Sequence, residues 1–403
     1  MVRIRHRAVK AVRYIKKVDK IYLLVGSLTI LLIIGSVTLV GLKTKTVDTE
    51  ESSKLVEQLL APCNDKSCVW DAAEKLTELY GPAIALSALE LYESSGQAVG
   101  DTHEWGHIVG RQTAETYGAT GESFLKCPTS FNYGCQHGFF EKVLGESDST
   151  RSAVDQICGQ LETDNNYSQK FKFYCYHGVG HGIMQSYAYD LTQSLDICDS
   201  LSTRMAQDGC WQGVFMENIN GEMYGKSEAG IFLADDPLAP CSRLDIKYQH
   251  ECYINHSAHL MKIYNGSVKQ ASEACLKARA DKIESCLLSI GLMTANDTWL
   301  PNLRPATSGP VVNRAWKLCL EFPKGYVDTC VEGAVDNILQ FDELNLGRAD
   351  TLCKLVDATI RQPCYRRIGY AVRAQVVNNS AAQNKCSQFA AVDKTACLEG
   401  AGV

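Results

Sequence analysis

The sequence predicts an all-α fold in which disulfide-stapled two-helix repeats form an α-solenoid, preceded by one N-terminal transmembrane helix. Three observations predict this fold. Eighteen cysteines all follow a long apolar N-terminal run and fall into close pairs that recur along the chain. A small residue, most often glycine, stands three positions after the second cysteine of most pairs. Strand-like alternation of apolar and polar residues is scarce.

The N-terminal segments predict a single-pass membrane protein. Residues 1–20 carry eight lysines and arginines, and residues 21–42 are apolar and long enough to span a bilayer as one helix. The positive-inside rule keeps this basic tail cytoplasmic and places the rest of the chain, after a polar stalk at 43–53, outside the cytoplasm. A cleaved signal peptide is the alternative. The apolar run is too long for one and no Ala-x-Ala site follows, which favours an uncleaved anchor.

Composition bounds the compartment and the class of protein. The 403 residues are 45% hydrophobic and 21% charged, enough for one long domain or two shorter ones. A net charge of −6 gives no indication of a nucleic-acid surface. An even and dense set of cysteines is typical of an oxidising compartment. Five glycosylation sequons are compatible with an external location: Asn166, Asn255, Asn265, Asn296 and Asn378.

The cysteines pair with their neighbours in the sequence. The predicted pairs are Cys63/Cys68, Cys127/Cys135, Cys158/Cys175, Cys198/Cys210, Cys241/Cys252, Cys275/Cys286, Cys319/Cys330, Cys353/Cys364 and Cys386/Cys397. Sequential pairing is the simplest interpretation, because short loops close easily and the last five pairs share an eleven-residue step. From Cys135 onward the second cysteine recurs every 33 to 44 residues, which is the range of two-helix solenoid repeats. The first cysteine is expected to end one helix, and the second to open the next.

The small residues indicate close helix packing. The residues at plus three from the second cysteine are Gly138, Gly178, Gly213, Ser289, Gly333 and Gly400. Glycine is costly inside a helix, so its recurrence predicts that another backbone approaches there. We divide the repeats into an N-terminal set at 54–260, which holds a histidine-rich metal site, and a C-terminal set at 261–403. No histidine follows Cys275, so the C-terminal set is structural or serves a protein partner.

Histidines fill two repeating positions of the N-terminal set. Counted from Asp101, Cys135 and Cys175, the residues at plus two and plus six are His103, His107, His137, Glu141, His177 and His181. Positions i and i+4 lie on one face of a helix, and stacked repeats place equivalent positions side by side. Five imidazoles and one carboxylate are therefore expected to converge as ligands of a divalent transition metal. The alternative is a buried polar network between helical layers.

Other polar and aromatic residues lie near this pattern. Glu217, His256 and His259 fall on the following helices and are expected to reach the edge of the site. Six aromatic residues flank the histidines and are predicted to belong to the core rather than to a substrate pocket. They are Trp105, Phe139, Phe140, Tyr176, Trp211 and Phe215.

The first histidine pair carries a protease-like motif. The segment His103-Glu104-Trp105-Gly106-His107 is an HExxH string, and Ile108-Val109-Gly110 extends it to HExxHxxG. This string resembles the opening of the metzincin signature, although Thr113 stands where that signature has its third histidine. The resemblance implies that His103 and His107 are zinc ligands and that Glu104 is the general base. The third ligand would then come from His137, Glu141 or His177.

The second histidine pair favours a different analogy. Gly178 stands where the first pair has Glu104, so the repeated unit is His-x₃-His and the glutamate is an addition. A five-histidine site resembles helical-repeat di-metal enzymes, in which two metals bridged by Glu141 would activate water or dioxygen. Zinc would favour hydrolysis, whereas iron or copper would favour redox chemistry.

The sequence thus predicts a membrane-anchored, extracytoplasmic helical-repeat protein that binds a divalent transition metal, with zinc favoured and iron or copper as alternatives. A metal-dependent hydrolase is the leading function. The alternative is a non-catalytic interaction scaffold, or a subunit of a membrane complex, in which the histidines are structural. The expected partners are the membrane, through 21–42, and a protein on the C-terminal repeats, but no nucleic acid.

Overall fold

The computed structural model describes residues 49–403 except for 97–98, 100–101, 132, 146–149, 227–229, 297–310 and 342–344. The chain divides into two units, residues 1–54 and residues 55–403. The predicted cytoplasmic tail, the anchor at 21–42 and the first part of the stalk lie outside the described residues. Within the described part, no helix combines the length and the apolar character needed to cross a membrane.

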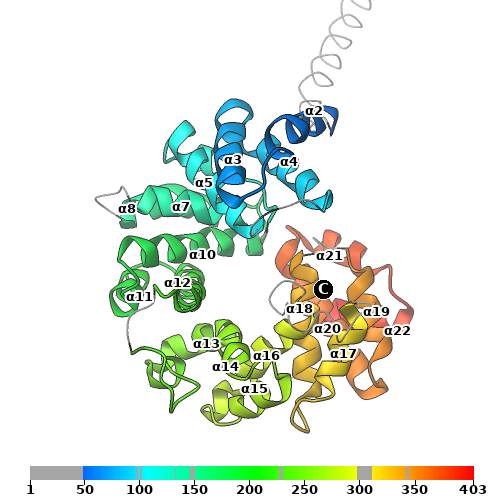
Figure 1. The fold of residues 1–403 in the computed structure, drawn as a ribbon. Coiled ribbons are helices and arrows are strands. Elements are labelled where there is room, and N and C mark those ends of the chain that lie inside the picture. Colours follow the sequence, from blue (N-terminus) through cyan, green and yellow to red (C-terminus); the bar gives the residue numbers. More distant parts are fainter. Residues whose placement is uncertain are drawn as a thin grey trace, which may run out of the picture. The chain divides into compact units, whose positions relative to one another are not determined.

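The prediction of an all-α fold of repeated, disulfide-paired helices is confirmed for the described ranges (Figure 1). These ranges contain no β-strand, and the nearest approach to one is an isolated bridge between Leu233 and Asp236. The two-helix repeats follow one another along the chain, so that neighbours in sequence are neighbours in space. Each repeat therefore buries its apolar face against the next one, as stacked helical repeats do.

The N-terminal helices precede the repeats. Short helices α2 (Thr49–Leu55) and η1 (Val56–Leu60) lead to α3 (Lys66–Tyr80), α4 (Pro82–Ser94) and α5 (Thr102–Tyr117). Asp65 caps α3, since its carboxylate accepts a hydrogen bond of 3.0 Å from the Cys68 amide. Gly81 has a φ of +85°, which lets the chain turn directly from α3 into α4. These helices bring α5 against the first repeat.

Each repeat joins a short helix to a long one. The long helices are α7 (Gly134–Gly145), α10 (Gln169–Ser186), α12 (Arg204–Tyr224), α13 (Ile246–Asn255), α16 (Ile283–Thr294), α18 (Val327–Phe341), α20 (Ala358–Gln375) and α22 (Ala391–Ala401). The short ones are α6 (Gly121–Phe124), η2 (Asp155–Gly159), α11 (Leu191–Asp199), η3 (Cys241–Arg243), α15 (Val268–Cys275), α17 (Val311–Cys319), α19 (Gly347–Leu355) and α21 (Asn379–Cys386). Further short segments are α8 (Thr150–Val154), α9 (Gln160–Glu162), α14 (Ser257–Ile263) and η4 (Ala280–Lys282). Each long helix packs against the long helix of the next repeat.

All nine predicted disulfides are present, and each joins the cysteines that are neighbours in the sequence. Each bond links the short helix of a repeat to the long one, or closes the turn before α3 or α7. The second cysteine opens its helix as expected at Cys135, the second residue of α7, but not in most of the later repeats. Cys175, Cys210 and Cys364 each lie six residues after the first residue of α10, α12 and α20. The long helices therefore start earlier than the cysteine pattern indicates.

The glycines at plus three lie where neighbouring helices touch, as predicted. A Cβ atom on Gly138 would stand 1.9 Å from the carbonyl oxygen of His107, and one on Gly213 would stand 2.0 Å from that of His177. Both distances are far shorter than a van der Waals contact, so only glycine fits. The pairs α5/α7 and α10/α12 are consequently in direct backbone contact, which fixes the positions of the histidines they carry.

The two histidine pairs do not share one register. Gly110 of α5 meets the carbonyl oxygen of Cys135, just as Gly180 of α10 meets that of Cys210. Because these glycines are equivalent, His107 corresponds to His177. The prediction that His103 corresponds to His177 is wrong by one helical turn. Helix α5 contains no cysteine, so the cysteine pattern does not mark its register.

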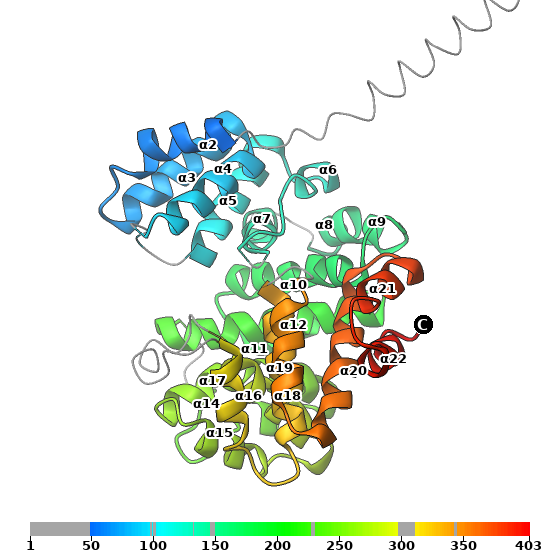
Figure 2. The same ribbon diagram turned by 90° about the vertical axis from the view of Figure 1, so that its right-hand side faces the viewer.

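The C-terminal repeats return to the N-terminal ones. Helix α20 contacts α10, and the Gln340 side chain of α18 donates a hydrogen bond of 3.3 Å to the Tyr174 hydroxyl of α10. Figures 1 and 2 show the orange helices beside the green ones at this point. Tyr174 also stacks on Tyr133, with ring centroids 4.1 Å apart. Helix α18 therefore contacts α10 within one turn of His177.

Candidate metal centre

The structure brings all five predicted histidines together. They come from three helices that pack in sequence, with His103 and His107 on α5, His137 on α7, and His177 and His181 on α10. His137 is at the centre, because its ring centroid lies 4.5 to 5.4 Å from those of the other four histidines. The convergence follows from the i, i+4 spacing within α5 and α10 and from the glycine contacts that hold the helices together.

The five imidazoles form two sets of three that can each hold a metal ion. One set, the outer triad, is His103, His107 and His137, and the other, the inner triad, is His137, His177 and His181. Within each triad the three ligand atoms lie within 4.8 Å of one another. His137 is common to both. The carboxylate of Glu141 belongs to neither triad, although the sequence pattern placed it among the ligands.

Within the described ranges, His137 has no hydrogen-bond partner. Its exposed fraction is 0%, and both ring nitrogens are buried without a donor or acceptor among the described residues. Burial of unpaired polar atoms costs about 1–3 kcal/mol each. A metal ion is a natural partner for such a nitrogen, whereas a purely structural polar network would satisfy it with a protein group.

The outer triad has the hydrogen bonds typical of metal-bound histidines. Nδ1 of His103 donates to the Phe131 carbonyl at 2.7 Å, and Nδ1 of His107 donates to Oε1 of Glu141 at 2.5 Å. A backbone carbonyl only accepts, so Nδ1 of His103 carries the proton and Nε2 offers its lone pair. The two Nε2 atoms face each other at 3.0 Å. Ligands of one tetrahedral zinc ion, with Zn–N of about 2.0–2.1 Å, stand about 3.3 Å apart, so a small opening admits an ion.

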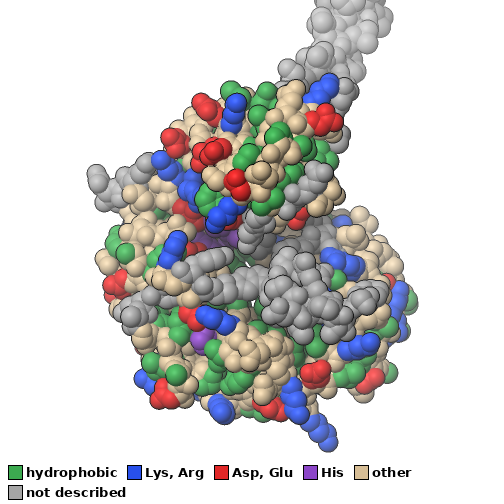
Figure 3. Space-filling model, in the orientation of Figure 1, with side chains coloured by type: hydrophobic (Ala, Val, Ile, Leu, Met, Phe, Trp, Pro, Cys, Tyr) green, Lys and Arg blue, Asp and Glu red, His purple; other side chains and the backbone are tan. Residues whose placement is uncertain are grey.

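The inner triad repeats this arrangement in part, because Nδ1 of His177 is buried without a hydrogen-bond partner among the described residues. Nδ1 of His181 bonds to Oε2 of Glu217 at 2.9 Å, and the Nε2 atoms of His177 and His181 face each other at 3.1 Å. All three histidines of this triad are buried. The outer triad is more accessible, since His103 is half-buried and the His107 side chain is 12% exposed. Figure 3 shows histidine atoms reaching the molecular surface in small patches.

The two glutamates are themselves held by further side chains. Arg111 donates to Oε2 of Glu141 at 2.6 Å, and the Tyr189 hydroxyl donates to Oε1 of Glu217 at 2.6 Å. The amide of Gln185 reaches both carboxylates. Sequence reasoning missed these three residues. A signal was available, because Arg111 and Gln185 continue the two histidine faces by one more turn, at i+4 from His107 and His181.

Strained backbone flanks this cluster. Four of the five non-glycine residues with positive φ in the described ranges lie beside it, namely Phe131, Tyr133, Ala188 and Tyr189. Phe131 supplies the carbonyl that accepts from His103, and Tyr189 supplies the hydroxyl that donates to Glu217. Such conformations are held only where the surrounding structure requires them, and they concentrate at functional sites.

Burial and neighbouring charges set the protonation of the cluster. Burial, aided by the four surrounding imidazoles, lowers the pKa of His137 well below its usual value, and burial likewise lowers that of His177. Burial alone would raise the pKa of Glu141, but His107 and Arg111 outweigh it and lower that pKa. The hydrogen bond from His181 similarly keeps the pKa of Glu217 low. The two carboxylates are therefore anionic, and the central imidazole is neutral and able to bind a cation.

The remaining sequence predictions have mixed outcomes. Glu217 joins the cluster as expected, but His256 and His259 gather elsewhere, beside Phe232. Glu104 is half-buried on α5, and its carboxylate makes no hydrogen bond or ion pair with the five histidines. The six flanking aromatic residues are buried, which confirms the core interpretation.

No protein-family model, no curated protein and no solved structure matches the chain.

Proposed function

We propose that this chain is a metal-dependent enzyme that works at the outer triad, with hydrolysis as the reaction class. One observation carries the proposal. The buried imidazole of His137 has no hydrogen-bond partner among the described residues, and it stands beside two Nε2 atoms whose rings are fixed through Nδ1 by a carbonyl and a carboxylate. This is how proteins orient histidine ligands around a metal ion.

Three nitrogen ligands support catalysis rather than a closed structural site. Zinc held by three histidines keeps a fourth position for water, and bound zinc makes that water a nucleophile near neutral pH. The outer triad has the solvent contact that such water requires, through the exposed fraction of His107. Glu104 directly follows His103 on α5 and is the candidate general base. An all-imidazole set also suits iron or copper, which would change the reaction to redox chemistry.

The proposal also includes the cellular compartment of the repeats. We place the repeats outside the cytoplasm, on an anchor formed by residues 21–42. The support is chemical, since every cysteine is in a disulfide and none is free. Reducing compartments do not sustain such a framework in most organisms.

A structural scaffold is the second candidate. The complete burial of His137, His177 and His181 favours it, because an ion held there would tie α7 to α10 without contact with solvent. In that case the C-terminal repeats would present the surface for a protein partner.

Metal content and turnover test both candidates. The full-length chain should retain stoichiometric zinc, iron or copper after exhaustive dialysis, and His137→Ala should lose it. His250→Ala is the matched control, because His250 lies on α13 away from the cluster. No metal in the wild-type chain after reconstitution would refute the proposal.

The general base is tested on the zinc-loaded chain with a panel of ester, peptide and phosphoester substrates. Glu104→Gln should keep the metal and lose about 10²–10⁴-fold in turnover. Glu115→Gln, on the same helix but with a side chain 60% exposed, should behave as wild type. Full metal occupancy without turnover of any substrate would favour the scaffold.

A further inference from the structure

We infer that the cluster holds two metal ions at once, one in each triad, and that the imidazole of His137 bridges them. The inference rests on the proposed metal centre and specifies its composition. It differs from a bridge through Glu141, because that carboxylate is bound to His107 and Arg111 and is absent from both triads.

The first argument is that both ring nitrogens of His137 need a partner. Both of its nitrogens are buried, and neither has a hydrogen-bond partner in the part of the chain that the structure describes. A single ion in either triad would bind one nitrogen and leave the other buried without a partner, at a cost of about 1–3 kcal/mol. Two ions satisfy both nitrogens. A bridging imidazole carries no N–H, so its remaining proton passes to solvent as the second ion binds.

The second argument is the pairing of the other four histidines. His103 and His107 face each other through Nε2 at 3.0 Å, and His177 and His181 do so at 3.1 Å. Each pair is thus a separate two-nitrogen chelate on its own helix. A single ion would have to gather nitrogens from both pairs, although each pair already converges on a point of its own.

The third argument is that each triad has a carboxylate of its own. Glu141 binds Nδ1 of His107, and Glu217 binds Nδ1 of His181, so each triad has one carboxylate behind one ligand. A carboxylate hydrogen-bonded to a histidine ligand is a usual feature of a metal site, so two such histidines are expected where two ions bind.

The fourth argument is the position of the two carboxylates. Both are nearly buried, with side chains 2% and 7% exposed, and each bonds to a histidine that would hold an ion. An ion in each triad would therefore place positive charge near each carboxylate.

Zinc titration of the metal-free full-length chain tests the number of ions. The wild-type chain should bind two equivalents, measured by elemental analysis after gel filtration. His103→Ala and His177→Ala should each bind one equivalent, because each removes a ligand from only one triad. His137→Ala should weaken both sites, and His250→Ala should retain two equivalents. Circular dichroism and a thiol count identify any variant that has not folded, and His103→Ala and His177→Ala decide the question if His137→Ala does not fold.

The outcomes separate this inference from the proposed function. One equivalent in the wild-type chain, lost in both His103→Ala and His177→Ala, would overturn the two-ion inference and leave the metal centre intact. No bound zinc, iron or copper after reconstitution would refute the proposed function itself. Copper loading tests the bridge. Two Cu²⁺ ions that share His137 should give a magnetically coupled spectrum, whereas two uncoupled signals would show that the imidazole is not shared.

Discussion

Gln185 connects Glu141 to Glu217. Its amide nitrogen lies 2.9 Å from Oε1 of Glu141 and 3.3 Å from Oε1 of Glu217. One side chain therefore bonds to both carboxylates that hold a histidine of the two triads. Replacement of Gln185 by alanine removes a donor from two buried carboxylates. We expect Gln185→Ala to lower the free energy of unfolding by about 1–3 kcal/mol. Urea denaturation measures this change, and an unaltered midpoint would contradict it.

The two glutamates should act on different ions. Glu141→Gln should weaken the outer ion by about 10–100-fold and leave the inner ion in place, because an amide holds the imidazole less strongly than a carboxylate. Glu217→Gln should do the reverse. Competition with a chromophoric zinc chelator measures both affinities. Equal weakening of both ions by either variant would show that the triads are not independent.

Gly138 should tolerate no side chain. Its Cβ would stand 1.9 Å from the His107 carbonyl oxygen, so Gly138→Ala must separate α5 from α7. Overpacking of a rigid contact costs about 1–3 kcal/mol or more, and the outer triad should lose its ion with the same change. Gly145→Ala is the control, because nothing lies within 4 Å of the position of its Cβ. Thermal unfolding compares the two variants, and equal midpoints would contradict the packing argument.

Acid should destabilise the chain partly through His256. This buried histidine donates from Nε2 to the Pro237 carbonyl at 2.8 Å, and burial lowers its pKa from 6.5 to about 4. Between pH 4 and pH 6.5, His256 binds a proton in the unfolded chain but not in the folded chain. The stabilisation is therefore complete above pH 6.5 and is lost as the pH falls towards 4.

The shift of His256 corresponds to about 3 kcal/mol at most. Urea unfolding of the wild-type chain and of His256→Gln at pH 7, 5.5 and 4 measures it. The stability of the variant should fall less steeply with acid. Parallel curves would show that burial does not lower the pKa of His256 in the folded chain.

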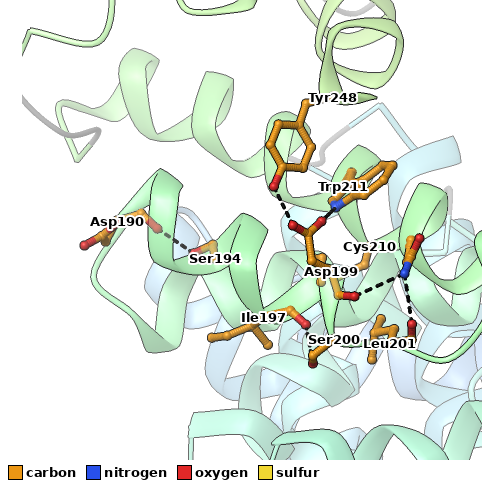
Figure 4. The surroundings of a disulfide bond; sticks show 11 residues. Asp190, Ser194, Ile197, Asp199, Ser200, Leu201, Cys210, Trp211 and Tyr248 are labelled. Carbon is orange, nitrogen blue, oxygen red and sulfur yellow. Dashed lines mark hydrogen bonds between the residues drawn. A yellow bond between two sulfur atoms is a disulfide. The ribbon is translucent and has the colours of Figure 1, made fainter. Parts of the chain in front are cut away.

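Asp199 should couple one hairpin to the next. Its carboxylate accepts from Nε1 of Trp211 at 3.1 Å and from the Tyr248 hydroxyl at 2.7 Å (Figure 4). Asp199→Ala leaves both donors without this acceptor and should cost about 1–3 kcal/mol. Asp196→Ala, exposed on the same helix, is the control. Denaturation curves that coincide for the two variants would argue against this coupling.

The cysteine and glycine patterns predicted much of the fold, because both report on short-range geometry. Two cysteines eleven residues apart can close a helical hairpin, and this spacing correctly predicted the pair Cys275 and Cys286. A glycine in a helix reports on a neighbouring backbone, as Gly213 does. Neither pattern reports where a helix starts, which is why the long helices begin before their cysteines.

The site could be predicted only in part. The i, i+4 rule grouped the histidines, but the register of α5 needed a reference residue. Trp105 occupies the position that cysteine has in the later repeats, since it lies five residues before Gly110 as Cys175 does before Gly180. The place of Glu141 depends on hydrogen bonds from three residues of two other helices, His107 and Arg111 of α5 and Gln185 of α10. Such competition between side chains for one carboxylate is not encoded in spacing.

The local order of the disulfides bears on how the chain reaches its native state. Every bond joins nearest-neighbour cysteines, and the largest separation is 17 residues. Each pair can close once its own hairpin has been synthesised, before the next cysteine is available to compete. Eighteen thiols allow a vast number of alternative pairings, but a chain that oxidises from its N-terminus onward meets only one partner at a time. The histidine helices would then be stapled before the C-terminal repeats arrive to contact α10.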